Sequence, residues 1–306
     1  MSSSVIEATG LSKKFGELTV LSDIFFDVRR SEIFSIVGPD GAGKSTLIRI
    51  LCGILRPNSG ELKILGFDTK FHRKEIKHNI GYLSQRFTLY GDLTVDENID
   101  FFAGIHREKD YSDRKKELLE FTQLTQFKNR LAEYLSGGMK QKLALVCTLI
   151  HRPQIIFLDE PTTGVDPVSR RDFWKILSAL LKTGITIFLA TPYLDEAERC
   201  NRVALMNKGK ILVCDKPNEI RALFKRKVIE VVTDDVRRAF NILKNADYLS
   251  DVQMFGDRLH VSPVDDIETT NKIMESLNKE QISLINFREI VPSMEDVFIS
   301  LITNGN

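Results

Sequence analysis

Short, largely apolar runs alternate with charge-rich stretches along residues 5–223 of the chain. The clearest of these runs cover residues 33–37, 155–158 and 185–190, and Gly, Pro or Asp residues flank them. Runs of this length are typical of strands that helices cover on both faces. The pattern therefore predicts an α/β layer around a largely parallel sheet.

Beyond the basic run at 225–227 the segments follow the order β-α-β-β-α-β, which is typical of a small ferredoxin-like α+β unit. The expected elements are a strand at 228–233, a helix at 236–245, a hairpin at 252–261 turning at Gly256-Asp257, a helix at 267–278, a strand at 282–287 and a closing helix at 294–302 capped by Ser293. We therefore expect two domains, residues 1–223 and an accessory domain at residues 228–306.

The overall composition limits the function classes. The 306 residues carry 43 Lys and Arg against 42 Asp and Glu, a net charge of +1, so a surface that wraps a polyanion is excluded and no nucleic-acid partner is expected. Hydrophobic residues make up 42%, enough for a sizeable core. No run approaches the ~20 apolar residues of a membrane span, and the first residues lack a signal-peptide core, so we expect a cytosolic location.

The cysteines and histidines show no metal-binding or redox spacing. The cysteines, expected to form neither a zinc site nor a disulfide framework, are Cys52, Cys147, Cys200 and Cys214. The histidines, expected to be surface residues, are His72, His78, His106, His151 and His260.

A phosphate-binding loop is predicted between the strand at 33–37 and a helix at 46–54, because the intervening residues fit the pattern G-x-x-x-x-G-K-[ST]. The matching residues are Gly38, Pro39, Asp40, Gly41, Ala42, Gly43, Lys44 and Ser45, and Thr46 follows them. Glycines let successive N–H groups point at phosphate oxygens, and the helix N-terminus adds its positive end. Lys44 is expected to reach the β- and γ-phosphates of a nucleotide, and Ser45 to bind Mg²⁺.

Two carboxylates end the strand at 155–158. A buried strand end is an unfavourable place for charge unless a cation or a reacting water receives it. Asp159 is therefore expected to hold Mg²⁺, and Glu160 to act as the general base that polarises the attacking water.

The third element, Ser136-Gly137-Gly138, opens a helix that continues through residue 150. With the three elements in this order, residues 5–223 resemble the nucleotide-binding subunit of an ABC transporter. The resemblance implies a P-loop NTPase fold of ABC type, with a mostly parallel core sheet, an antiparallel β subdomain and a helical subdomain. It also implies Mg²⁺-dependent ATP hydrolysis.

Further residues receive roles from this resemblance alone. Phe15 matches the aromatic residue that stacks on adenine, and Gln85 matches the glutamine that senses Mg²⁺ and the attacking water. The segment after Gln85 matches the region that faces the membrane partner. Asp166 matches the loop that crosses between two ATP-binding subunits, in a dimer where the Ser136-Gly137-Gly138 segment of one meets the γ-phosphate bound by the other.

The resemblance further implies a membrane permease as partner, a homodimer or heterodimer of ATP-binding subunits, and a peripheral position on the cytoplasmic face of the membrane. The last segment, PSMEDVFISLI, resembles the tail of subunits in the multidrug and daunorubicin-resistance branch of exporters. Export of a drug, a lipid or another hydrophobic small molecule is the activity this implies.

Two positions depart from the family pattern. Met139 replaces the usual glutamine at the end of the signature, and Pro192 replaces the switch histidine that contacts the γ-phosphate. Proline offers neither a side-chain donor nor a backbone N–H. Hydrolysis is thus expected to be slowed; the alternatives are a heterodimer half whose partner completes the site, and a regulatory clamp that binds ATP.

Two other function classes compete. A kinase that uses the same loop needs an acceptor pocket and a lid, and it leaves Ser136-Gly137-Gly138 and Asp166 unexplained. A soluble ABC ATPase of translation or DNA repair usually carries two cassettes or a long coiled coil, and this chain has one cassette and no sustained heptads.

Overall fold

The computed structural model describes residues 4–86, 89–264 and 269–304. The chain divides into two compact units, Met1–Pro217 and Asn218–Asn306. Helix α8 (Pro217–Ala222) thus lies almost entirely in the second unit, whereas the sequence interpretation ended the first domain at residue 223.

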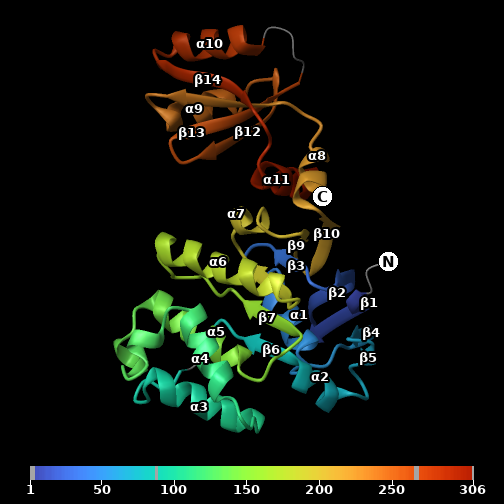
Figure 1. Ribbon diagram of the computed structural model, residues 1–306. Helices are drawn as coiled ribbons and strands as arrows, with labels where there is room; N and C mark the ends of the chain where they lie inside the picture. Colours follow the sequence, from blue (N-terminus) through green and yellow to red (C-terminus); the bar gives the residue numbers. More distant parts are fainter. Residues whose placement is uncertain (1–3, 87–88, 265–268, 305–306) are drawn as a thin grey trace. The chain divides into compact units, whose positions relative to one another are not determined.

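The first unit is built on a six-stranded sheet of order β10-β9-β3-β8-β7-β6 (Figure 1). All neighbours are parallel except β10, which pairs antiparallel with β9. The strands are β3 (Ile33–Val37), β6 (Ile80–Leu83), β7 (Ile155–Asp159), β8 (Thr186–Thr191), β9 (Arg202–Asn207) and β10 (Lys210–Asp215). Every residue of β3, β7 and β8 is buried, which confirms the three strands predicted from their apolar runs.

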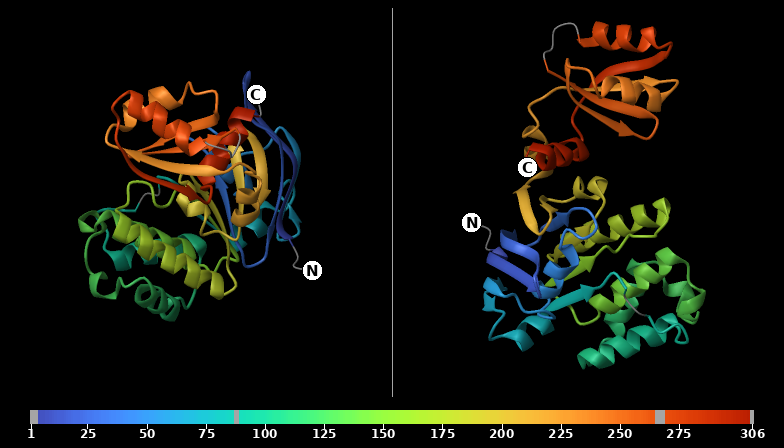
Figure 2. Two further views of the ribbon diagram at one scale, coloured as in Figure 1. Left: turned by 90° about the horizontal axis from the view of Figure 1, so that it is seen from above. Right: turned by 180° about the vertical axis from the view of Figure 1, so that it is seen from behind.

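A second, antiparallel sheet of order β2-β1-β4-β5 packs its apolar residues into the same core. Its strands are β1 (Ser4–Phe15), β2 (Leu18–Arg29), β4 (Ser59–Ile64) and β5 (Phe67–Asp68). Figure 2 shows the blue antiparallel sheet and the green helices on opposite sides of the central sheet. The predicted ABC-type architecture of a parallel core, an antiparallel subdomain and a helical subdomain is therefore confirmed.

The helices of the first unit are α1 (Lys44–Leu51), α2 (Arg73–Asn79), α3 (Val95–His106), α4 (Ser112–Phe121), α5 (Gly137–Leu149), α6 (Pro167–Lys182) and α7 (Leu194–Ala197), with short 3₁₀ turns η1 (Thr125–Phe127) and η2 (Ala132–Tyr134). Helices α3, α4 and α5 pack together as the helical subdomain, whereas α1 packs against strands of the core. Helix α3 begins with a capping box, in which Glu97 N donates to Thr94 Oγ1 at 3.2 Å and Thr94 N donates to Glu97 Oε2 at 2.8 Å.

The second unit is a four-stranded antiparallel sheet of order β12-β13-β11-β14. Its elements are β11 (Val228–Thr233), α9 (Val236–Leu243), β12 (Leu249–Phe255), β13 (Arg258–Pro263), α10 (Thr269–Lys279), β14 (Leu284–Ile290) and α11 (Met294–Asn304). Helices α9 and α10 bury Leu243 and Ile273 against one face of the sheet. This confirms the β-α-β-β-α-β order, although residue 267, the expected start of α10, lies outside the described residues.

The prediction that all five histidines are surface residues is wrong for two of them. His151 is 5% exposed: its Nε2 lies 2.9 Å from the Ile80 carbonyl, and its ring stacks on His106 with centroids 3.7 Å apart. The His260 side chain is 11% exposed and lies 2.9 Å from Asp296 Oδ1. Both side chains are covered by segments distant in sequence, which a spacing rule does not detect.

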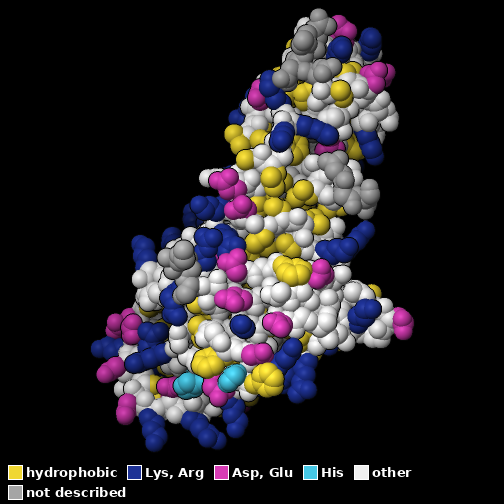
Figure 3. Space-filling model, turned by 90° about the vertical axis from the view of Figure 1, so that its right-hand side faces the viewer, with side chains coloured by type: hydrophobic (Ala, Val, Ile, Leu, Met, Phe, Trp, Pro, Cys, Tyr) yellow, Lys and Arg dark blue, Asp and Glu magenta, His cyan; other side chains and the backbone are white. Residues whose placement is uncertain are grey.

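The face displayed in Figure 3 agrees with the balanced composition. Figure 3 shows Lys and Arg side chains interspersed with Asp and Glu over the displayed face. Among the described residues, no helix has the length and apolar character needed to cross a bilayer.

Candidate active site

The phosphate-binding loop follows β3 directly, and α1 begins at Lys44. A Cβ on Gly38 would lie 2.1 Å from the Met206 carbonyl oxygen. Gly43 has φ 106°, and a Cβ there would lie 2.8 Å from Leu21 Cδ2. The tight path of the loop therefore requires glycine at both positions.

Lys44 is buried within the loop that it follows. Its Nζ donates to the carbonyl oxygens of Gly38 at 2.8 Å and Pro39 at 3.0 Å, and it lies 3.4 Å from Glu160 Oε1. The exposed Asp40 carboxylate is 4.0 Å away. The ammonium group thus stands between the phosphate-binding backbone and the acid expected to act as base.

Asp159 ends β7 beside the start of α1. The Ser45 hydroxyl donates to its Oδ1 at 3.0 Å, and the Tyr82 hydroxyl lies 3.5 Å from its Oδ2. Burial raises the pKa of Asp159; the Ser45 hydrogen bond opposes this shift and the charge of Glu160 adds to it. A hydroxyl and a carboxylate side by side fit Mg²⁺, which takes few protein oxygens and completes its shell with phosphates and water.

Glu160 occupies a strained backbone position, with φ 51° in the left-handed region. Its N–H donates to the Ala190 carbonyl at 2.9 Å, which joins the ends of β7 and β8. Gln85 Nε2 donates to Glu160 Oε2 at 3.0 Å, and Thr163 Oγ1 lies 3.4 Å from the same oxygen. The carboxylate is 7% exposed and has a fixed orientation.

Lys44, Ser45 and Glu160 line one open pocket of about 800 Å³. Gly38, Pro39 and Asp159, which were also predicted for the site, are not among its lining residues. The predicted site residues among its walls are Asp40, Gly41, Gly43, Lys44, Ser45, Thr46, Gln85 and Glu160. Sequence reasoning gave no site role to Leu18, Val20, Thr163 and Tyr193, which also line it. Leu18 is an apolar residue at the end of a hairpin and is 66% exposed. This unusual position was the one sign in the sequence that could have indicated a binding role.

Phe15 does not line this pocket. It is 48% exposed at the end of β1, with Lys13 Nζ 5.0 Å from the centre of its ring. Ala42 is 2% exposed and packs into the core, so it serves the loop through its backbone.

The Ser136-Gly137-Gly138 segment and Asp166 also lie outside the pocket, at two helix N-termini that contact each other. Ser136 Oγ accepts from Met139 N at 3.3 Å and caps α5, while Asp166 Oδ1 accepts from Ser169 N at 3.0 Å and caps α6. A Cβ on Gly138 would lie 2.4 Å from Ser169. Glycine at this position thus allows α5 and α6 to approach closely.

Comparison with known proteins decides the family. The family described as ABC transporter matches residues 21–163, and the one described as ATP-binding protein DrrA1-3-like, C-terminal domain, matches residues 216–302. The Nod factor export ATP-binding protein I of Ralstonia nicotianae is 32% identical over 304 residues, covering 98% of this chain and 94% of that protein. The chain belongs to the ABC transporter ATP-binding proteins.

Other relatives agree with this family. The probable multidrug ABC transporter ATP-binding protein YbhF of Escherichia coli is 41% identical over 220 residues, which are 71% of this chain and 38% of that protein. The daunorubicin resistance ATP-binding protein DrrA2 of Streptomyces coeruleorubidus is 30% identical over 97% of this chain and 94% of that protein. A solved ATP-binding subunit of an ABC transporter superposes with a TM-score of 0.65 at 28% identity, covering 72% of this chain and 93% of that one.

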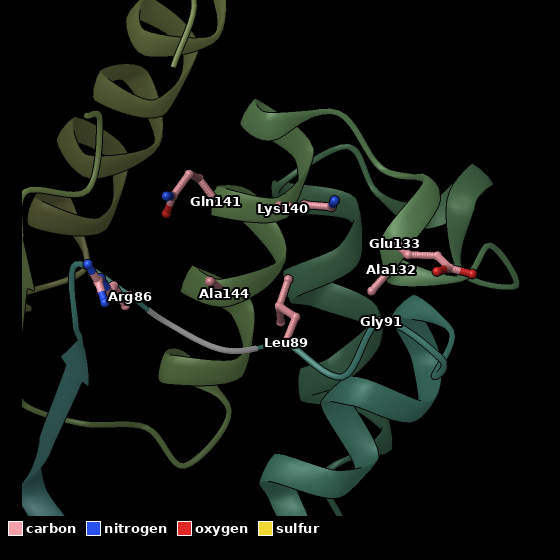
Figure 4. A pocket seen from close by; sticks show the side chains of 8 residues that line it. All are labelled: Arg86, Leu89, Gly91, Ala132, Glu133, Lys140, Gln141 and Ala144. Carbon is pink, nitrogen blue, oxygen red and sulfur yellow. The ribbon is translucent and has the colours of Figure 1, made fainter. Parts of the chain in front are cut away.

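A second pocket of this ABC protein, about 390 Å³, connects the segment after Gln85 with the signature helix α5. Figure 4 shows Arg86 and Leu89 across from Gln141 and Ala144 of α5, with Glu133 near the far end. Arg86, Leu89 and Gly91, from the segment expected to face a membrane partner, therefore lie beside the helix that begins at Gly137.

Proposed function

We propose that this chain is the ATP-hydrolysing subunit of an exporter. The observation that carries the proposal is the Glu160 carboxylate, buried in the pocket, 3.4 Å from Lys44 Nζ and hydrogen-bonded by Gln85. A base held by two partners beside a phosphate-binding loop suits in-line attack of water on a γ-phosphate. A protein that only binds ATP has no need of this carboxylate.

Each residue has a distinct task in this mechanism. Lys44 and the loop N–H groups bind the β- and γ-phosphates, and Ser45 and Asp159 would hold Mg²⁺. When bound, Mg²⁺ neutralises charge on the phosphate oxygens. Glu160 accepts a proton from the attacking water, and Gln85 orients that carboxylate through its amide.

Pro192 lines the same pocket and has no side-chain donor. Losing one group that stabilises developing charge typically costs about 10²–10³ in rate. We therefore infer slow but real hydrolysis. A heterodimer half, or a clamp that binds ATP without turnover, is the alternative that Pro192 favours.

The active unit in this proposal is a head-to-tail dimer. Ser136 and Gly137 are exposed at the start of α5 and free of their own chain's pocket, so they suit a γ-phosphate held by a second subunit. Asp166 lies at the neighbouring helix start. Closure on ATP and opening after hydrolysis then drive the permease.

The proposed partner is a membrane permease bound from the cytoplasmic face, and the proposed cargo is a drug, a lipid or another hydrophobic small molecule. The relatives' names support this class, since they refer to multidrug transport, daunorubicin resistance and Nod factor export.

Steady-state hydrolysis of Mg²⁺-ATP over a series of protein concentrations tests the proposal, with Glu160→Gln and Pro192→His measured beside the native chain. We expect turnover that rises more than in proportion to protein concentration, that disappears in Glu160→Gln and that increases in Pro192→His. Absence of turnover in the native chain with recovery in Pro192→His would instead support the clamp or heterodimer half.

A further inference from the structure

A second acidic side chain, Glu196 of α7, is buried behind the pocket and has four hydrogen-bond donors. It is 1% exposed. Oε1 accepts from Thr162 Oγ1 at 2.6 Å, Arg170 Nε at 3.0 Å and Trp174 Nε1 at 3.2 Å, and Oε2 accepts from Thr191 Oγ1 at 2.7 Å. A buried carboxylate with this many short bonds fixes the groups around it.

The donors come from three segments, two of which continue into the walls of the pocket. Thr162 lies two residues after Glu160, and Thr191 directly precedes Pro192. Arg170 and Trp174 belong to α6, the helix that Asp166 caps. One carboxylate therefore connects the base, the loop at Pro192 and the helix beside the signature segment.

The same groups hold Tyr193, which lines the pocket next to Pro192. Its backbone N–H donates to Thr191 Oγ1 at 3.1 Å, and the Arg170 guanidinium lies 4.2 Å from the centre of its ring. Backbone and ring are thus held by two residues that Glu196 binds.

We propose that Glu196 is a positioning residue for ATP hydrolysis, which keeps the loop of Thr191, Pro192 and Tyr193 in register with Glu160. The inference rests on the proposed function. Pro192 has no side-chain donor for the nucleotide, so the placement of this loop depends on the contacts behind it. Small displacements of groups at a reacting centre lower kcat more than substrate affinity.

The test compares two neighbouring acids on α7. Glu196→Gln keeps the shape but loses the charge that binds four donors, and Asp195→Asn removes the exposed acid that also pairs with Arg170, at 3.2 Å. We expect Glu196→Gln to lower kcat about tenfold or more with KM for ATP within about twofold, and Asp195→Asn to change both less than about twofold.

A second pair keeps the test decisive if Glu196→Gln does not fold. Thr191→Val removes the bridging hydroxyl at nearly constant shape, and Thr191→Ser retains it. We expect Thr191→Val to lower kcat and Thr191→Ser to keep kcat close to the native value. Native kcat in both Glu196→Gln and Thr191→Val, or equal losses in the two Thr191 variants, would overturn the inference.

Trp174 supplies a readout that is independent of turnover, because it is the chain's single tryptophan and donates to Glu196. In the Glu160→Gln variant, we expect Mg²⁺-ATP to shift the fluorescence of Trp174. In the double variant Glu160→Gln, Glu196→Gln, we expect no such shift, although equilibrium dialysis should still detect bound ATP. If the native chain does not hydrolyse ATP but this shift behaves as expected, the proposed function fails, while the placement of the loop of Thr191, Pro192 and Tyr193 by Glu196 stands. Hydrolysis with a shift unaffected by Glu196→Gln would contradict the positioning role alone.

Discussion

Asp159 in the first unit and Glu230 in the second are both almost excluded from solvent, at 1% and 5% exposure, yet folding moves their pKa values in opposite directions. Burial raises the pKa of Asp159, which faces one hydroxyl at 3.0 Å. Hydrogen bonds from Arg288 at 2.8 Å and Arg258 at 3.0 Å lower the pKa of Glu230.

The two histidines with covered side chains lie in different surroundings. In the first unit, burial lowers the pKa of His151 to about 4, its Nδ1 has no hydrogen-bond partner, and its ring stacks on another imidazole. In the second unit, His260 faces Asp296, whose pKa is lowered because bonds from His260 and Ser293 outweigh the effect of burial. Burial thus disfavours the charged form of Asp159, which lies beside Ser45 of the pocket. A cation bound there would favour that charge.

The largest expected effect is at Asp159, where a substitution should lower activity and raise stability. Asp159→Asn should lower Mg²⁺-dependent hydrolysis by about 10² or more, because the proposed carboxylate ligand of Mg²⁺ is lost. It should also raise the free energy of unfolding without nucleotide by on the order of 1 kcal/mol, since burial opposes the charged carboxylate. Hydrolysis assays and urea unfolding measure the two effects; a loss of stability would show that the fold depends on this charge.

The next largest expected effect is the loss of stability when His151 becomes protonated at acid pH. Its pKa of about 4 in the folded protein lies below the ordinary value near 6.5, so the unfolded chain binds more protons between these values. Its contribution is therefore complete above pH 6.5 and falls by about 2–3 kcal/mol as the pH drops to 4.

The measurement is the free energy of unfolding against pH for the native chain and for His151→Leu, which lacks this titration. The difference between the two curves should change between pH 6.5 and 4. A constant difference would mean that the pKa of His151 is the same in the folded and the unfolded protein.

The smallest effect concerns Glu230. Glu230→Gln should lower the free energy of unfolding of the second unit by about 1–2 kcal/mol, because Arg258 and Arg288 lose a charged acceptor but are themselves partly solvated. Hydrolysis should stay within about twofold of native. Asp257→Asn, at an exposed acid that pairs only with Arg258 among the described residues, is the matched control and should change stability by less. Equal losses in the two variants would remove the contrast with Asp159.

Sequence patterns predicted much of the fold because the structure of these segments depends on their own residues. Strands β3, β7 and β8 were predicted because residues covered on both faces must be apolar over their whole length. The hairpin at Gly256-Asp257 was predicted from local turn chemistry. Glu196 was not singled out, because an acid in the segment LDEAER has the same local pattern as a solvated helix face.

The sequence by itself determined the phosphate-binding loop, the acid pair and the signature segment, since each is a short contiguous motif whose chemistry follows from adjacent residues. The tertiary structure alone decided that Gln85 contacts Glu160, that Leu18 and Tyr193 border the pocket and Phe15 does not, and that four donors surround Glu196. These contacts join segments that are distant in the sequence; Gln85 and Glu160, for example, are 75 residues apart. Such pairings are set by how strands order in the sheet and helices pack upon it, and no local pattern encodes that order.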